Sequence, residues 1–538
     1  MGRPDRQTLG LLAVVVCAVA VYWTQMNTGR FGFYHDDGIY AVTAQALATG
    51  QGYRIISLPD QPAQTKYPPL YPFLLSLIWR CFPDFPENLP RLIAFSVMLA
   101  ALLLAVTYAY LVRLGGVGRG TALVIVILMA FNGRLIWHAG SLFAELPYAL
   151  LSVLALWAVE RYATTDRHGL GVLAGLLLGL AYLTRVIGLT LLLAAVVWLL
   201  AKRLPRKLPV VLLCCALLIV PWLIWQRTHR SPAHTPAAAY YTDYTSDFSA
   251  RVGDIQSLPA RVAKNLFYVA VVFVPLVSLS LDYQHSKDAR FLPALVCAFA
   301  LIVLGLVKRC LAGPRLQEVY VIFYLGLLLI LPYTEVFDRY ILPLLPFLLL
   351  YLVTQWRQFL RPRPAPAVGR PLGLVFAVGM LIIALPVVYH FVRVPGIRES
   401  EHLYREHARL EQPVLDWVRR NTPPDAVILS YRDPVVFLRT GRRAANSSFM
   451  YERGFYAEGQ GFDPSQTRFR LDLIEEVRAD YLILLASDFA FDFHPEALRQ
   501  GIEQAMASSP HRFTLMHETS PPFAKIYHLR RADGRAPF

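Results

Sequence analysis

The hydrophobic residues of this chain lie in long runs, not in short alternating stretches. Apolar runs of roughly 20 residues recur between residues 9 and 391, and about 20 apolar residues suffice to cross a bilayer as one helix. Membrane β-barrels are built instead from alternating segments of about 10 residues. The pattern therefore predicts an α-helical polytopic membrane protein with about 11 to 13 spans.

Basic residues in the first half of the chain indicate which ends of the runs face the cytoplasm. Arg3 and Arg6 precede the first run as in a signal peptide. No convincing cleavage site follows, so we expect an uncleaved span with its N-terminus inside. Arg113, Arg119 and the basic segment 202–207 mark further cytoplasmic loops. The spans expected here are residues 9–25, 89–111, 121–136, 146–159 and 170–183, one that ends before Lys202, and 208–225.

A polar segment rich in tyrosine, residues 226–260, separates these spans from a second group. The basic loops at 308–315 and 357–370 both belong inside by charge, and simple alternation of the spans would put the second one outside. We therefore expect one run, 266–281, not to cross, and this places the chain after Phe391 on the outer side. The runs of this group are 266–281, 291–307, 319–332, 341–356 and 372–391.

The first outer loop, residues 26–88, is expected to hold two short helices. Residues 36–49 predict an amphipathic helix that ends at Gly50 and Gly52. Residues 68–82 are apolar but short and marked by prolines, which favours a helix lying along the membrane surface. The apolar side of the first helix would consist of Ile39, Val42, Ala46 and Leu47.

The end of the chain has the composition of a soluble domain. We divide the protein into a transmembrane domain, residues 1–391, and a small C-terminal α/β domain, residues 392–538, which we expect on the periplasmic side. Its periodicity predicts a helix at 414–420, a strand at 426–430, a helix at 471–478 and a buried strand at 481–485.

Charge and cysteine content agree with a membrane protein. Only 17% of the 538 residues are charged, against roughly 25% in soluble domains. The net charge of +15 is better explained by cytoplasmic loops and anionic headgroups than by nucleic acid. None of the six cysteines lies beyond Cys310, so we expect no disulfide framework in the C-terminal domain.

The predicted topology sends a set of polar side chains to the outer ends of the spans. A wet helix end would explain any one of them, but the adjacent acids Asp36 and Asp37 lie close to the membrane, where carboxylates are costly unless they are solvated, paired or used. Carboxylates can act as a general base, and cations can neutralise a phosphate leaving group. The set comprises Asp36, Asp37, Lys66, His138, Glu145, Arg185, Glu335, Asp338 and Arg339.

Three short motifs then resemble those of the GT-C glycosyltransferases. Residues 35–40 read HDDGIY and are followed by KYPPLYP at 66–72, which is similar to the first outer loop of that family. Residues 339–343, RYILP, and 183–185, LTR, also resemble its signatures. The branch with the most similar motifs contains the protein O-mannosyltransferases and the lipid A aminoarabinose transferase.

The resemblance implies an inverting sugar transfer from a polyprenyl-phosphate donor to a lipid, glycan or protein acceptor on the periplasmic side of the inner membrane. It implies that Asp36 is the base, that Asp37 is the neighbouring acid, and that Lys66 contacts the donor phosphate. Tyr67 stands between Lys66 and the Pro-Pro step, which departs from the family pattern. The remaining candidates for binding substrate are Tyr67, His138, Glu145, Arg185, Arg339 and Tyr340. Some branches use a divalent metal, but the sequence has no clear ligand set, and we expect no required cofactor.

Two other functions use the same classes of residue. A carrier or flippase for lipid-linked saccharides would be expected to place polar groups near mid-span or in matching broken helices. A polysaccharide polymerase or ligase would more naturally have a large loop late in the chain. Here the charges lie at span ends and the acidic pair is in the first loop, which favours the transferase.

Overall fold

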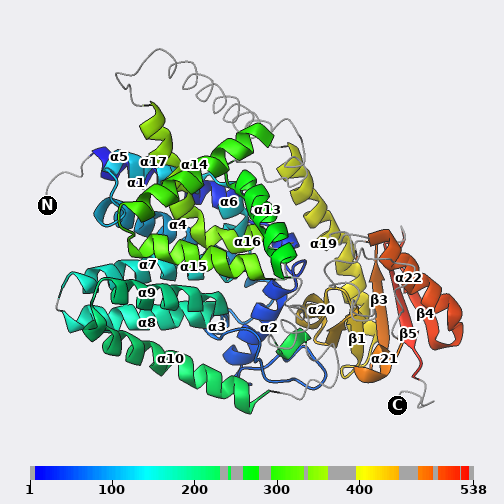
Figure 1. Ribbon diagram of the computed structural model, residues 1–538. Coiled ribbons are helices and arrows are strands. Elements are labelled where there is room, and N and C mark those ends of the chain that lie inside the picture. The colour runs from blue at the N-terminus through cyan, green and yellow to red at the C-terminus, as the bar shows by residue number, and fades with distance from the viewer. Residues whose placement is uncertain are drawn as a thin grey trace. The chain divides into compact units, whose positions relative to one another are not determined.

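The fold is described from a computed structural model of the chain (Figure 1). The structure describes residues 6–165, 167–230, 240–243, 258–277, 292–331, 337–360, 395–447, 471–486, 488, 495–520 and 523–531. Two compact units are present. The helical unit comprises Met1–Met26, Ile93–Leu223 and Asp254–Ser400. The loop–sheet unit comprises Asn27–Leu92, Ile224–Gly253 and Glu401–Phe538.

The predicted spans of the first half are helices in the structure. Long apolar stretches form them because a helix satisfies its own backbone hydrogen bonds without water. Their bounds are α1 Arg6–Thr24, α4 Leu89–Arg113, α5 Arg119–Ala130, α6 Gly133–Ala139, α7 Glu145–Ala163, α8 His168–Thr184, α9 Leu189–Ala201 and α10 Leu208–Thr228.

The run at 121–136 departs from the prediction of one continuous span. It is divided into α5 and α6, which are bent by 61° relative to each other. Asn132 lies at the break, and its side chain accepts hydrogen bonds from the backbone nitrogens of Arg134 and Leu135. An asparagine side chain that caps a new helix in this way competes with continuation of the old one.

The later helices of this unit are α13 Leu258–Val277, α14 Leu292–Leu311, α15 Leu316–Ile330, α16 Phe337–Ile341 and α17 Leu345–Leu360. A short 3-10 helix, Leu342–Leu344, joins α16 to α17. The predicted span 372–391 lies outside the described residues. Among the described helices, four are long and apolar enough to cross a membrane, or five if the bent pair is one span. The prediction of a polytopic helical membrane protein is confirmed, whereas the side on which each loop lies stays a prediction.

The loop–sheet unit contains the two predicted helices of the first loop, α2 Asp36–Ala48 and α3 Leu70–Cys81. They pack against each other, and α2 also contacts a helix of the C-terminal region, α20 Asp433–Thr440. Because α2 has neighbours on more than one side, its burial extends from the predicted apolar residues to Tyr40, Thr43 and Ala44. Gly50 ends this segment with a φ of +76°, a conformation that favours glycine.

The C-terminal region forms a five-stranded sheet in the order β2-β1-β3-β5-β4. The strands are β1 Val427–Ser430, β2 Arg443–Asn446, β3 Tyr481–Leu485, β4 Phe513–Glu518 and β5 Ala524–Leu529. Strand β1 is parallel to β2 and β3, whereas β5 is antiparallel to β3 and β4. Every residue of β1 is buried, as expected for a central parallel strand.

The predicted α/β class of this region is confirmed. The expected strands at 426–430 and 481–485 correspond to β1 and β3, and the helix at 414–420 is the end of a longer helix, α19 Pro395–Asn421. The helix expected at 471–478 is shorter than predicted, because α21 spans only Leu473–Glu476. Strands β2, β4 and β5 and helices α20 and α22, Pro495–Ser508, were not predicted.

Candidate active site

The acidic pair begins helix α2, immediately after a tight corner at His35. This residue has a φ of +58°, which is uncommon for a residue other than glycine. Asp36 and Asp37 occupy the first turn of the helix, where the helix dipole favours negative charge. The local sequence thus directs both carboxylates to the amino end of one helix.

Asp37 is buried and holds the corner together through its carboxylate. One carboxylate oxygen, Oδ2, accepts a hydrogen bond of 2.8 Å from the backbone nitrogen of Gly32, and the other accepts one of 2.9 Å from Gly38. Burial raises the pKa of Asp37 to about 6, although both backbone contacts oppose this shift. Asp37 therefore fixes the backbone on both sides of Asp36.

Asp36 is only partly buried, and it contacts the second motif of the first loop. The hydroxyl of Tyr67 donates a hydrogen bond of 2.5 Å to Oδ1 of Asp36. Burial and the neighbouring Asp36 hold the pKa of Tyr67 well above its ordinary value, so this phenol remains a donor. The tyrosine that departs from the family pattern thus contacts the proposed base directly.

Lys66 lies beside Tyr67 but points to the tyrosine-rich segment. Its side-chain nitrogen donates a hydrogen bond of 2.6 Å to the carbonyl oxygen of Tyr240 and lies 4.1 Å from the centre of that ring. The residue is 6% exposed. A buried ammonium needs such partners because its desolvation is costly.

A histidine and an aspartate far apart in the sequence also meet in this unit. The Nε2 atom of His35 lies 2.9 Å from Oδ1 of Asp433, and its Nδ1 lies 3.1 Å from the hydroxyl of Tyr240. Tyr241 donates a hydrogen bond of 2.8 Å to the other oxygen of Asp433. His35 stood in the motif used for the resemblance and Tyr240 in the tyrosine-rich segment, but no sequence signal singled out Asp433.

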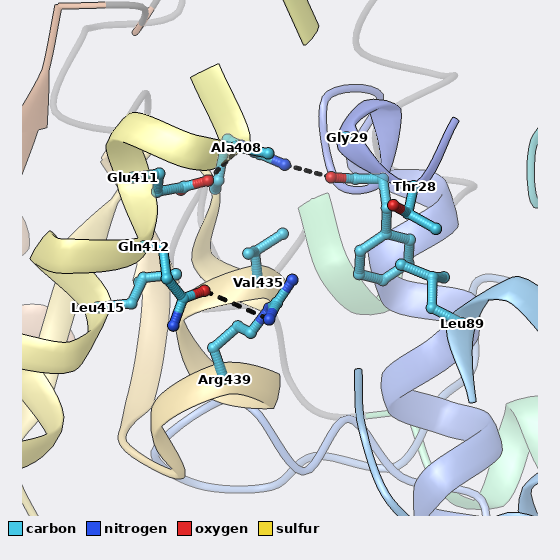
Figure 2. A pocket seen from close by; sticks show the side chains of 11 residues that line it. Thr28, Gly29, Leu89, Ala408, Glu411, Gln412, Leu415, Val435 and Arg439 are labelled. Carbon is cyan, nitrogen blue, oxygen red and sulfur yellow. Dashed lines mark hydrogen bonds and ion pairs between the residues drawn. The ribbon is translucent and has the colours of Figure 1, made fainter. Parts of the chain in front are cut away.

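A small pocket lies elsewhere in the same unit, next to α19 and α20. Figure 2 shows Thr28 and Gly29 on one side and Glu411, Gln412 and Arg439 on the other. Arg439 donates a hydrogen bond of 3.3 Å to Gln412, and Glu411 forms an ion pair of 2.5 Å with Arg432. Burial raises the pKa of Glu411. The pocket is lined by neither Asp36 nor Lys66, so we do not assign it to the candidate site.

Predicted residues of the helical unit form a separate cluster around Glu145. This residue begins α7 and is completely buried. Its Oε1 atom is 2.5 Å from Nη1 of Arg185 and 2.9 Å from Nε of Arg339. Arg185 lies at the end of α8, and its guanidinium lies 4.9 Å from the ring centre of Tyr340. Four residues chosen from sequence are thus in contact.

His138 lies at the edge of this cluster. Its Nδ1 atom is 2.7 Å from the carbonyl oxygen of Arg134, and its ring centre is 5.7 Å from that of Phe143. The guanidinium of Arg339 lies 4.4 Å from the same Phe143 ring. Two predicted outer residues cannot be placed, because Glu335 and the side chain of Asp338 lie outside the described residues.

The predicted site residues therefore fall into two groups, one in each unit. Within the described part of the chain, no three His, Cys, Asp or Glu side chains are arranged to hold a metal ion. The two groups are Asp36, Asp37, Lys66 and Tyr67 in the loop–sheet unit, and His138, Glu145, Arg185, Arg339 and Tyr340 in the helical unit.

Comparison with known proteins bears on the fold. Residues 66–225 match the family model of dolichyl-phosphate-mannose-protein mannosyltransferases. The structure of ArnT from Cupriavidus metallidurans bound to undecaprenyl phosphate is similar over 98% of this chain and 99% of that one, with a TM-score of 0.56 and 12% identity. The chain has the GT-C fold.

An archaeal relative gives the same result. The oligosaccharyltransferase AglB from Archaeoglobus fulgidus, in complex with an inhibitory peptide and a dolichol-phosphate, is similar over 97% of this chain and 74% of that one, with a TM-score of 0.53 and 14% identity. No curated protein matches in sequence. At these identities the structural likeness establishes the fold, and the expected resemblance to the GT-C glycosyltransferases is confirmed at the level of the fold.

Proposed function

We propose that this protein is a membrane glycosyltransferase that moves a sugar from a polyprenyl-phosphate donor to a lipid, glycan or protein acceptor. The reaction inverts the anomeric configuration, and Asp36 is its general base. The active site faces the periplasm, and the spans lie in the inner membrane. The observation that carries this proposal is the hydrogen bond of 2.5 Å between Tyr67 and Asp36, because it joins the two motifs of the first loop at one carboxylate.

The step balances without a further reactant. The Asp36 carboxylate takes the proton of an acceptor hydroxyl or amine, and the acceptor atom forms a bond to the anomeric carbon of the sugar. The bond between that carbon and the phosphate oxygen breaks, and the polyprenyl phosphate leaves with the electron pair. Attack from the side opposite the leaving group inverts the carbon. A positioned base of this kind contributes about 10²- to 10⁴-fold to the rate.

Cations of both units are suited to the phosphate. Lys66 is a buried ammonium in the loop–sheet unit. In the helical unit, Arg185 and Arg339 both contact the carboxylate of Glu145, so two cations meet one anion among the described side chains of this cluster. Guanidinium groups bind phosphate oxygens through paired hydrogen bonds. Each of these cations is a candidate contact of the donor phosphate, and Glu145 orients the two arginines.

The donor class is supported by the two solved relatives. One was solved with undecaprenyl phosphate and the other with a dolichol-phosphate and a peptide. Both lipids are polyprenyl phosphates, which keep their tails in the bilayer while the phosphate reaches a site at the membrane surface. We extend this donor class to the present chain because it shares their fold.

The contact between His35 and Asp433 supports the proposed topology. His35 belongs to the first loop and Asp433 to the C-terminal domain, and a hydrogen bond of 2.9 Å joins them inside one compact unit. The two segments must therefore lie on the same side of the membrane. If the first loop is periplasmic, as we propose, then the C-terminal domain is periplasmic too.

The proposal is tested with purified protein in lipid vesicles and a panel of radiolabelled polyprenyl-phosphate sugars. Loss of label from the lipid to an acceptor, or to water in the absence of one, is expected with at least one donor. Transbilayer movement of the donor without loss of label would support the carrier instead and overturn the proposal. The anomeric configuration of the product, measured by NMR, tests inversion separately.

A further inference from the structure

We propose that Asp433, in the C-terminal domain, is a positioning residue that holds the catalytic corner at Asp36 through His35. This inference rests on the proposed function, because it concerns the same base. It adds a residue that no motif indicated and gives the C-terminal domain a part in building the active site.

Asp433 is a buried acceptor with several donors directed at it. It is fully buried at the start of α20, directly after strand β1 and a short turn. Beside His35 and Tyr241, the side-chain nitrogen of Asn446 donates a hydrogen bond of 3.2 Å to its Oδ1. A buried carboxylate is costly unless its oxygens are paired. These donors therefore fix both the place and the orientation of the Asp433 side chain.

His35 is held at both ring nitrogens. The carboxylate of Asp433 can only accept, so Nε2 of His35 donates to it, and Nδ1 of the same ring contacts the hydroxyl of Tyr240. The backbone of His35 has a φ of +58°, a conformation that persists where surrounding contacts impose it. The next residue along the chain is Asp36. A change in the ring contacts of His35 is thus transmitted directly to the backbone of the base.

A second contact joins the same two turns. A β-carbon added to Gly38 would lie 2.6 Å from the β-carbon of Pro434, the residue after Asp433. The first turn of α2 and the first turn of α20 are therefore packed closely, and Figure 1 shows the two helices side by side. The hydrogen bond between His35 and Asp433 and this packing together fix the corner against the C-terminal domain.

The contacts around His35 also extend to Lys66. Tyr240 contacts His35 through its hydroxyl and accepts a hydrogen bond from Lys66 through its carbonyl oxygen. One chain of contacts thus runs from Asp433 through His35 and Tyr240 to Lys66. Removal of Asp433 should disturb the geometry of the base more than the binding of the donor, because Lys66 keeps its contact with the Tyr240 backbone.

The test compares Asp433→Leu, His35→Phe and the double variant in the full-length protein. Each substitution keeps approximate size and removes the polar contacts. The control is Asp425→Asn, which changes an exposed acid of the same domain. We expect kcat to fall about 10- to 100-fold in each single variant, as for a misplaced catalytic group, with the donor KM within about twofold of wild type. The double variant should be no slower than the slower single variant, because both substitutions break one connection.

The outcomes separate this inference from the proposed function. If wild type transfers no sugar from any donor, the proposed function fails. If wild type is active and the kcat of Asp433→Leu equals that of wild type, only the inference fails. The inference would also fail if the fold-losses of kcat in the two single variants multiplied in the double variant, or if KM rose while kcat stayed unchanged. If Asp433→Leu does not fold, as judged by its thermal unfolding midpoint, His35→Phe alone decides, because the His35 side chain is less deeply buried than that of Asp433.

Discussion

Tyr67 donates a hydrogen bond of 2.5 Å to Asp36, which is 31 positions earlier in the chain. The ring of Tyr67 also packs edge to face on Tyr40 at a centroid distance of 5.1 Å. Tyr67 therefore has a polar contact with Asp36, the proposed base, and an apolar contact with the helix that carries it. These two contacts can be separated by substitution.

Tyr67→Phe should remove the hydrogen bond and keep the packing. A hydrogen bond to a charged group contributes about 1.5 to 3 kcal/mol to stability, so the thermal unfolding midpoint should fall. Because the same bond positions the Asp36 carboxylate, we expect kcat to fall about tenfold or more. Initial rates of label transfer measure this. Tyr527→Phe, in strand β5, is the matched control and should be as active as wild type. Wild-type kcat in Tyr67→Phe would mean that the contact does not serve the base.

Gly32 is expected to tolerate no side chain. Its φ is +85°, its backbone nitrogen binds Asp37, and an added β-carbon would collide with Val435. Gly50 is a useful control, because its φ is +76° but nothing lies within 4 Å of an added β-carbon. A left-handed conformation costs a residue other than glycine about 1 to 2 kcal/mol.

We therefore predict that Gly50→Ala lowers the thermal unfolding midpoint slightly and keeps activity. Gly32→Ala should lower the midpoint further and reduce kcat at least about tenfold, because the collision displaces the corner that Asp37 holds. Unfolding curves and initial rates of both variants test this. Equal behaviour of the two variants would show that the contact with Val435 has no effect on the site.

The buried carboxyl group of Asp488 makes the stability of the folded protein depend on pH. Burial raises its pKa from 3.8 to about 7, so the folded protein binds this proton more tightly than the unfolded chain. Its stabilising contribution is complete below about pH 4 and is lost as the pH rises through about 7. Asp488→Asn resembles the protonated acid and can still accept the hydrogen bond from Leu485.

The thermal unfolding midpoint of Asp488→Asn should thus exceed that of wild type at pH 8 by more than it does at pH 5. The exposed Asp425→Asn is the control and should follow wild type at both values. Melting curves in detergent at the two pH values measure the difference. If Asp488→Asn raised the unfolding midpoint more at pH 5 than at pH 8, this would contradict the upward shift of the Asp488 pKa.

Arg339 should contribute to donor binding. It shares Glu145 with Arg185, and a lost charge-assisted hydrogen bond to phosphate costs about 1.5 to 3 kcal/mol. Arg339→Gln is therefore expected to raise the donor KM about tenfold or more. Arg206→Gln, at an exposed position in another loop, serves as the control. A KM for Arg339→Gln equal to that of wild type would remove this residue from the phosphate site.

The sequence was most informative where one local pattern decides the structure. Long apolar runs predicted the helices of the membrane part, and the prolines and glycines of the first loop predicted the ends of α2 and α3. The break at Asn132 was missed, because a single capping side chain does not interrupt the apolar pattern. The pattern of α2 also understated its burial, which depends on α20, a helix almost 400 positions later.

In the candidate site, too, residue type and position predicted some residues, whereas contacts between distant segments could not be predicted. Asp36, Lys66, Glu145, Arg185 and Arg339 could be chosen from residue type and position, and the structure groups Glu145 with both arginines. Asp433 could not be chosen in this way. Its contact with His35 spans 398 positions, and in the sequence it is an ordinary aspartate before a proline at the start of a helix.

The most direct test of the central claim compares Asp36→Asn with Asp60→Asn in the transfer assay. Asp60 is an exposed acid of the same loop, so its substitution controls for a change of charge near the membrane. If Asp36 is the base, kcat should fall about 10²-fold or more in Asp36→Asn and stay at the wild-type value in Asp60→Asn. Equal kcat for Asp36→Asn and wild type would contradict the account and place the base elsewhere.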